Sequence, residues 1–240
     1  MKLHWTELRA EGLGVGARHV KPDGTQAYAC RFDEVLSFHA PGIAPVSRNG
    51  VSWYIDVTGK PVFQRWFKKA FGFYDGLAAV EDDTGAFHID ECGRDAYGLR
   101  FGWCGNFQEK RCSVRTGDGL YYHIRPDGTP AYSERYRYAG DFKYGVAVVQ
   151  RVDGKSTHIC SDGRFLHGLW FQDATPYHKG VTAVCDEEGW FHADEKGQPL
   201  YKKRFYSIEP FYNGQAHAVG LDGCRVIIGR DGDVIVDLLR

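Results

Sequence analysis

The sequence repeats a glycine-centred turn at intervals of 35, 34, 35, 35, 34 and 35 residues. The glycines of these turns are Gly24, Gly59, Gly93, Gly128, Gly163, Gly197 and Gly232. A fixed period of this length indicates a repeat architecture, in which each copy buries its apolar face against neighbouring copies. The period therefore constrains the fold before any single residue is interpreted.

One copy, residues 137–171, divides into four short segments that read as strands. These are RYAGDF, GVAVVQR, KSTHIC and RFLHGLWF, with tight turns around VDG and SDG between them. Glycine in such turns takes a positive φ without steric cost, so the segments are expected to pair as an antiparallel meander. No segment has a sustained 3.6-residue apolar period, and the sequence predicts an all-β chain.

Four-stranded units in series suggest the blades of a β-propeller, which protects its strand edges by radial repetition, although a unit of 34–35 residues is short for a blade. We therefore predict a propeller-like single array over residues 1–240, with an open β-superhelix or solenoid as the alternative. About seven units are expected, and the first is degenerate. Their predicted ranges are 1–32, 33–67, 68–101, 102–136, 137–171, 172–205 and 206–240.

Composition excludes several classes of partner and site. The net charge is −1, so no basic surface for nucleic acid or anionic membrane is expected. The N-terminus MKLHWTELRAEG lacks the apolar core of a signal peptide, and no apolar run is long enough for a membrane span. The seven cysteines form no C-x-x-C pair, so we predict no metal, no cofactor and a reduced, cytoplasmic chain.

A histidine column is the sharpest chemical feature of the repeat. Five residues before the turn glycines stand His19, Tyr54, His88, His123, His158, His192 and Ile227. A metal or anion site on an axis is one interpretation. The other is a structural network, because buried polar groups need hydrogen-bond partners. Histidines on separate blades are expected to lie too far apart to share one ion, which favours the structural network.

A second column precedes the closing aromatic residue of each repeat. It holds Arg31, Arg100, Arg135 and Arg204, with Trp66 and Trp170 in two repeats. Stacking of arginine on neighbouring aromatic rings is one interpretation, and a row of guanidinium groups facing an acidic partner is the other. The candidate partner-binding residues are Arg100 and Arg135, together with Trp103 and Arg111 of the divergent third complete repeat.

The columns resemble the WG repeat of bacterial proteins, also called the KWG or Leptospira repeat. The resemblance rests on F-x-x-G-x-A-x-V, an acidic-glycine turn, H/Y-I-D-x-x-G and Y-x-x-R-F, and it extends from about residue 13 to 240. It implies a repeat array, which in some related proteins precedes a methyltransferase-type domain. The segment EKRC at 109–112 departs from the pattern and leaves the second strand of its repeat uncertain.

No catalytic residues are predicted, because nearly every Asp and His belongs to a repeat column and no nucleophile or zinc-protease motif is present. We therefore expect a bacterial non-catalytic scaffold that binds another protein. The alternatives are a recognition module associated with an enzyme, such as a methyltransferase-type domain, and a propeller that binds a sugar or another small ligand.

Overall fold

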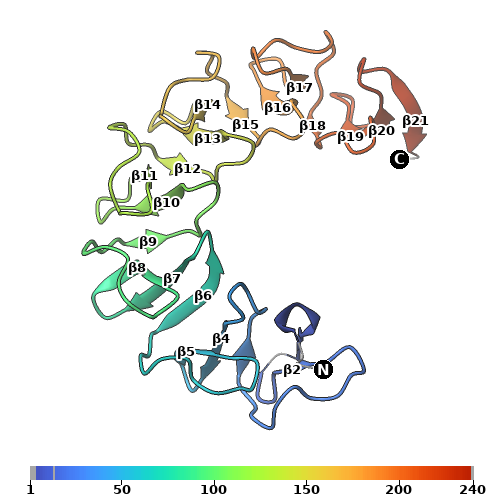
Figure 1. Cartoon of the computed structure of the whole chain (residues 1–240). Helices are drawn as coiled ribbons and strands as arrows, with labels where there is room; N and C mark the ends of the chain where they lie inside the picture. Colours follow the sequence, from blue (N-terminus) through green and yellow to red (C-terminus); the bar gives the residue numbers. More distant parts are fainter. Residues whose placement is uncertain (1–3, 13, 239–240) are drawn as a thin grey trace. The chain divides into compact units, whose positions relative to one another are not determined.

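The computed structural model describes residues 4–12 and 14–238, so the predicted array ends at 1 and 240 lie outside the described residues. The chain forms two compact parts. The N-terminal part comprises residues 1–119 and 123–130, and the C-terminal part comprises residues 120–122 and 131–240. Each part is a succession of small antiparallel sheets (Figure 1).

The sheets of the N-terminal part follow one another in sequence order. A 3-10 turn, η1 (Trp5–Glu7), precedes them. They are β1 (Arg9–Glu11) with β2 (Arg18–Val20); β3 (Glu34–Val35) with β4 (Ala44–Arg48) and β5 (Val51–Ile55); β6 (Lys69–Tyr74) with β7 (Leu77–Asp82) and β8 (Gly85–Asp90); and β9 (Trp103–Cys104) with β10 (Cys112–Arg115). Strand β11 (Tyr121–Ile124) lies where the two parts divide.

The C-terminal part repeats the same order of strands. Its sheets are β12 (Tyr138–Ala139) with β13 (Val146–Gln150) and β14 (Ser156–Cys160); β15 (Asp173–Ala174) with β16 (Thr182–Cys185) and β17 (Trp190–Ala193); and β18 (Ser207–Ile208) with β19 (Ala216–Val219), β20 (Arg225–Ile228) and β21 (Val234–Leu238). The all-β class and the antiparallel repeat sheets predicted from the sequence are confirmed. Within the described ranges, no helix is long and apolar enough to cross a membrane.

The fourth segment of most repeats is bulged rather than continuously paired. In residues 33–67 it attaches to β5 by two isolated bridges, Ile55↔Pro61 and Ser52↔Phe67. Three steps along β5 thus face six steps along the segment, so the extra residues loop out of the ladder. Proline at position 61 also lacks an N–H donor. The last repeat pairs its fourth strand more fully, as β20 with β21.

The divergent repeats keep their pattern of burial and pairing. In the first, β1 pairs with β2, Leu8 and Ala17 are buried in one core, and Trp5 packs against the same core. In the third complete repeat, β10 pairs with β9 despite the EKRC departure. Glu109 and Lys110 have φ of 51° and 60°, so Lys110 takes the left-handed conformation that Gly76 and Gly145 have at the same place in other repeats. The second strand of this repeat is therefore present.

Neighbouring repeats are joined by aromatic rings that cover the next turn glycine. Positions 28, 63, 97, 132 and 201 supply a tyrosine or phenylalanine ring, which packs on the glycine at 59, 93, 128, 163 and 232, respectively. A Cβ added to Gly59 would lie 2.7 Å from Cγ of Tyr28, far inside van der Waals contact. The repeat glycines thus serve the turn and also leave room for the ring of the preceding repeat.

Candidate functional site

Four histidines of the predicted column make the same pair of hydrogen bonds. In three of them, Nδ1 meets the hydroxyl of a tyrosine nine residues later: His19 with Tyr28, His88 with Tyr97, and His192 with Tyr201. His158 meets Nε2 of His167 instead, at 3.2 Å. In all four, Nε2 lies 2.8 to 3.0 Å from a backbone carbonyl just after the first strand of the next repeat.

These contacts fix the proton positions in the column. A carbonyl oxygen only accepts, so Nε2 carries the proton and Nδ1 accepts. The donor to Nδ1 is the tyrosine hydroxyl in three copies and Nε2–H of His167 in the copy of His158, since His167 Nδ1 accepts from Leu169 N. Burial disfavours the charged ring and lowers the pKa of His88, His158 and His192 to about 4, against the weaker raising effect of the carbonyl bonds. It also lowers the pKa of His19. These rings are therefore neutral near pH 7, with both nitrogens engaged.

The other members of the column are buried as well. Tyr54 is fully buried, and its hydroxyl donates directly to the carbonyl of Phe71 at 2.8 Å. His123 is also fully buried. Within the described residues, no three His, Cys, Asp or Glu side chains gather closely enough to hold a metal ion. The geometry supports the structural interpretation of the column.

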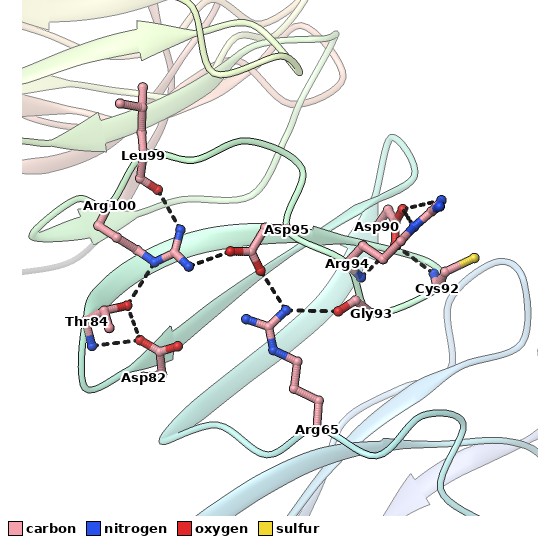
Figure 2. A network of polar contacts seen from close by, with 10 residues as sticks. All are labelled: Arg65, Asp82, Thr84, Asp90, Cys92, Gly93, Arg94, Asp95, Leu99 and Arg100. Atoms are coloured by element: carbon pink, nitrogen blue, oxygen red, sulfur yellow. Dashed lines mark hydrogen bonds and ion pairs between the residues drawn. The ribbon is translucent and has the colours of Figure 1, made fainter.

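The predicted binding residue Arg100 belongs to a polar network inside the N-terminal part (Figure 2). Its guanidinium carbon lies 3.6 Å from the centroid of the Phe87 ring, and it donates to Asp95 and to Thr84 Oγ1. Arg65 donates to the other oxygen of Asp95 at 2.6 Å and to Gly93 O at 3.0 Å. Partial burial opposes ionisation of Asp95, but the hydrogen bonds from both arginines outweigh it and lower the pKa of the carboxyl.

Arg135, the second arginine predicted to bind a partner, is also turned toward its own part of the chain. It lies 3.6 Å above the Tyr122 ring and donates to the carbonyls of Ser133 and Glu134. The structure places Arg100 in the N-terminal part and Arg135 in the C-terminal part. Stacking on aromatic neighbours, the first interpretation of this column, describes both side chains.

Trp103 and Arg111 occupy the same repeat of the N-terminal part. Trp103 begins β9, is 42% exposed and is paired with Arg115 on β10. Arg111 precedes β10, and its Nη1 donates to Lys110 O at 2.9 Å. Trp103 is thus exposed, whereas Arg111 is half-buried.

Two clefts that the sequence reasoning missed lie beside the tryptophans of the arginine column. One lies beside Trp66 and includes Asp82 and Asp83 of the next repeat. The other lies beside Trp170, includes residues 186–188 of the next repeat, and has a volume of about 410 Å³. The sequence feature that could have indicated these clefts is the tryptophan at 66 and 170, where most other repeats have arginine.

Comparison with known proteins identifies the repeat. Residues 54–83 match the family model described as the WG-containing repeat, which confirms the predicted resemblance. No curated protein matches the chain.

Solved structures with similar folds cover most of the chain. The computationally designed Ika8 protein has a TM-score of 0.53 at 14% identity, with 97% of this chain and 84% of that one covered. BamB from Moraxella catarrhalis has a TM-score of 0.51 at 13% identity, with 99% and 86% covered. The WD40 β-propeller domain of Doa1 has a TM-score of 0.42 at 14% identity, with 92% and 87% covered. At these identities the likeness to Ika8 and BamB concerns the fold alone, and the likeness to BamB supports the propeller-like fold predicted from the sequence.

Proposed function

We propose that this WG-repeat chain is a non-catalytic scaffold that binds another protein through aromatic side chains exposed on the first strands of its repeats. The observation that carries the proposal is the exposure of Trp103 and Tyr138. They hold the same position, at the start of β9 and β12, and are 42% and 49% exposed. Other repeats hold polar residues in this position: Glu34, Lys69, Asp173 and Ser207.

The position of these aromatic residues favours binding over a role in folding. Repeats with Lys69 or Asp173 form the same first strand without an aromatic ring. The Trp103 and Tyr138 rings each pack on one side over a glycine two residues later, Gly105 and Gly140, and are otherwise exposed. Exposed tryptophan and tyrosine are enriched among the residues that contribute most to protein interfaces. Because these two residue types are preferred at interfaces, we take the partner protein to cover them.

The hydrogen-bond network supports the non-catalytic part of the proposal. A catalytic site needs an asymmetric group of residues whose reactive atoms reach a substrate. Here the most reactive buried side chains, such as His88 and Tyr97, bond to each other and recur in register along the chain. Arg100 and Arg135 have intrachain partners, which favours a structural role for them as well.

The test compares capture of partner proteins by matched folded variants. The full chain is immobilised, incubated with lysate from its native source, and the bound proteins are identified by mass spectrometry. The double variant Trp103→Ala/Tyr138→Ala should lose the specifically captured protein, whereas Lys69→Ala/Asp173→Ala, changed at the same repeat position, should retain it. Equal capture by both variants contradicts the proposed surface. Substrate turnover abolished by one substitution in a folded variant contradicts the non-catalytic reading.

A further inference from the structure

The cleft beside Trp170 combines an aromatic wall with carboxylates from the next repeat. Trp170 is the second-last residue of the repeat 137–171. Glu187 and Glu188 lie in the turn between β16 and β17. All the lining residues belong to the C-terminal part. Its volume of about 410 Å³ lies in the range of small-ligand pockets and accommodates a long side chain with adjacent backbone.

The charges in this cleft leave a negative excess. Asp186 is neutralised by Arg204, whose Nε and Nη2 lie 2.9 and 2.8 Å from one of its carboxylate oxygens. That leaves the carboxylates of Glu187 and Glu188 against the single ammonium of Lys155. Both glutamates are exposed, and no ion pair involving them is found in the described part of the chain. The cleft thus attracts a cation.

The equivalent cleft beside Trp66 shows how the same arrangement is neutralised. There Lys68 Nζ lies 2.7 Å from Asp83 Oδ1, so the carboxylate that corresponds to Glu187 already has a cation. The residue that corresponds to Lys68 is Gln172, which carries no charge. Two further positions differ: Glu188 replaces Thr84 and adds a carboxylate, and Lys155 replaces Val51 and adds an ammonium group. Together these differences leave two glutamates with one lysine in the Trp170 cleft.

The chain itself indicates which cation suits such a site. Arg204 pairs with Asp186 while its guanidinium carbon lies 3.8 Å from the centroid of the Phe191 ring. Trp170 packs against one guanidinium of its own chain, because Arg151 lies 4.0 Å from its ring centroid, and Arg151 is not among the residues that line the cleft. A planar guanidinium stacks on an aromatic ring and bonds a carboxylate with parallel N–H groups, which an ammonium group does not.

We infer that the Trp170 cleft binds an arginine side chain of the partner protein, with the guanidinium against the indole and its N–H groups on Glu187 and Glu188. The inference rests on the proposed function, since it names the chemistry of one contact of the scaffold. It places this contact at a site distinct from Trp103, which lies in the N-terminal part.

The test is an NMR titration of the full chain with N-acetyl-arginine amide as the probe. The ¹⁵N-labelled indole signal of Trp170 is assigned by its loss in Trp170→Ala. We expect this signal to shift saturably with the arginine probe and to stay unchanged with the uncharged N-acetyl-citrulline amide. Gln172→Lys should weaken binding about tenfold, because the added ammonium neutralises the cleft as Lys68 does in its own repeat. Trp66→Ala is the matched control and should leave the titration unchanged.

Two results would overturn the inference: no saturable shift at Trp170, or a shift of equal affinity in Gln172→Lys. Its failure is distinguishable from failure of the proposed function. If partner capture still depends on Trp103 and Tyr138 while the arginine probe does not bind, only the cleft assignment is wrong. If the probe binds and no protein is captured through the first-strand aromatics, the cleft assignment stands without the proposed protein scaffold.

Discussion

Gly59→Ala tests whether aromatic rings of one repeat stabilise the chain by packing on the turn of the next. The glycine has φ of +82°, and an added Cβ would lie 2.7, 2.9 and 3.1 Å from Cγ, Cδ2 and Cβ of Tyr28. Tyr28 is nearly buried, and its hydroxyl is bonded to His19, so the ring cannot move aside without losing that bond. Gly24→Ala is the matched control. Gly24 has φ of +80° at the same repeat position, and no described atom lies within 4 Å of its Cβ site.

The two substitutions share every cost except the clash. Placing alanine in the left-handed region costs about 1–2 kcal/mol in both, and the reduced freedom of the unfolded chain returns about 0.4–1 kcal/mol in both. Overpacking against a fixed ring adds about 1–3 kcal/mol for Gly59 alone. We therefore expect Gly24→Ala to lower the free energy of unfolding by up to about 1.5 kcal/mol, and Gly59→Ala by about 1–3 kcal/mol more.

Urea denaturation followed by circular dichroism measures both losses. A double-mutant cycle with Tyr28→Ala then separates the ring contact from other effects, because Gly59→Ala should be less destabilising once the ring is gone. Equal losses for Gly24→Ala and Gly59→Ala would refute the reasoning, as would a cycle with no coupling between positions 28 and 59.

Two further predictions concern the histidine column. The triple variant His88→Tyr/Tyr97→Phe/Cys112→Ala introduces the residues found at the equivalent positions one repeat earlier, Tyr54, Phe63 and Ala78. The hydroxyl of the new tyrosine should donate to Gly105 O, as the Tyr54 hydroxyl donates to Phe71 O. We expect urea denaturation to give a loss below about 1.5 kcal/mol, whereas His88→Tyr alone should lose about 1–3 kcal/mol more by overpacking, and similar stability of the two variants would contradict this. The pKa near 4 of His88, His158 and His192 also predicts a pH dependence, since the unfolded chain binds protons below the ordinary value of 6.5 and the folded chain does not. The contribution of these histidines to stability is then complete above pH 6.5 and falls as the pH drops toward 4, by up to about 1.4 kcal/mol per pH unit for each histidine. A flat pH profile for the wild type, or an unchanged slope in the triple variant, would contradict neutral buried rings.

The repeat period and the strand positions could be predicted because both are written into local sequence. Turn glycines and alternating apolar residues act within a few positions of themselves. The partner of each histidine could not be predicted in the same way. Its Nε2 bonds a backbone carbonyl 17 residues later, and Leu36, Gly105, Thr175 and Glu209 supply that carbonyl in different repeats. Any residue offers a carbonyl, so the sequence column carries no trace of the acceptor.

The bulged fourth segment was missed for a related reason. A prediction of four strands per repeat assumes that paired strands have equal numbers of residues between two bridges. Here the bridges are three residues apart on β5 but six residues apart on the fourth segment, between Pro61 and Phe67. The extra residues of the fourth segment lie between these two bridges, and they include Phe63, whose ring packs on Gly93 of the next repeat. Such a register depends on contacts between repeats, which a single unit of sequence does not contain.

Side chains at the arginine-column position interact with residues of the turn between the second and third strands of their own repeat. Arg204 meets Asp186 in this turn, whereas Trp170 meets Arg151 at the edge of the corresponding turn of its own repeat. Charge and ring thus exchange places between these two repeats. An external partner can pair with a charge that has no ion-pair partner in its own repeat. Lys68 pairs with Asp83, whereas Gln172 at the same position cannot pair with Glu187. Comparing the repeats with one another therefore points to the proposed arginine contact, which a consensus repeat sequence would not show.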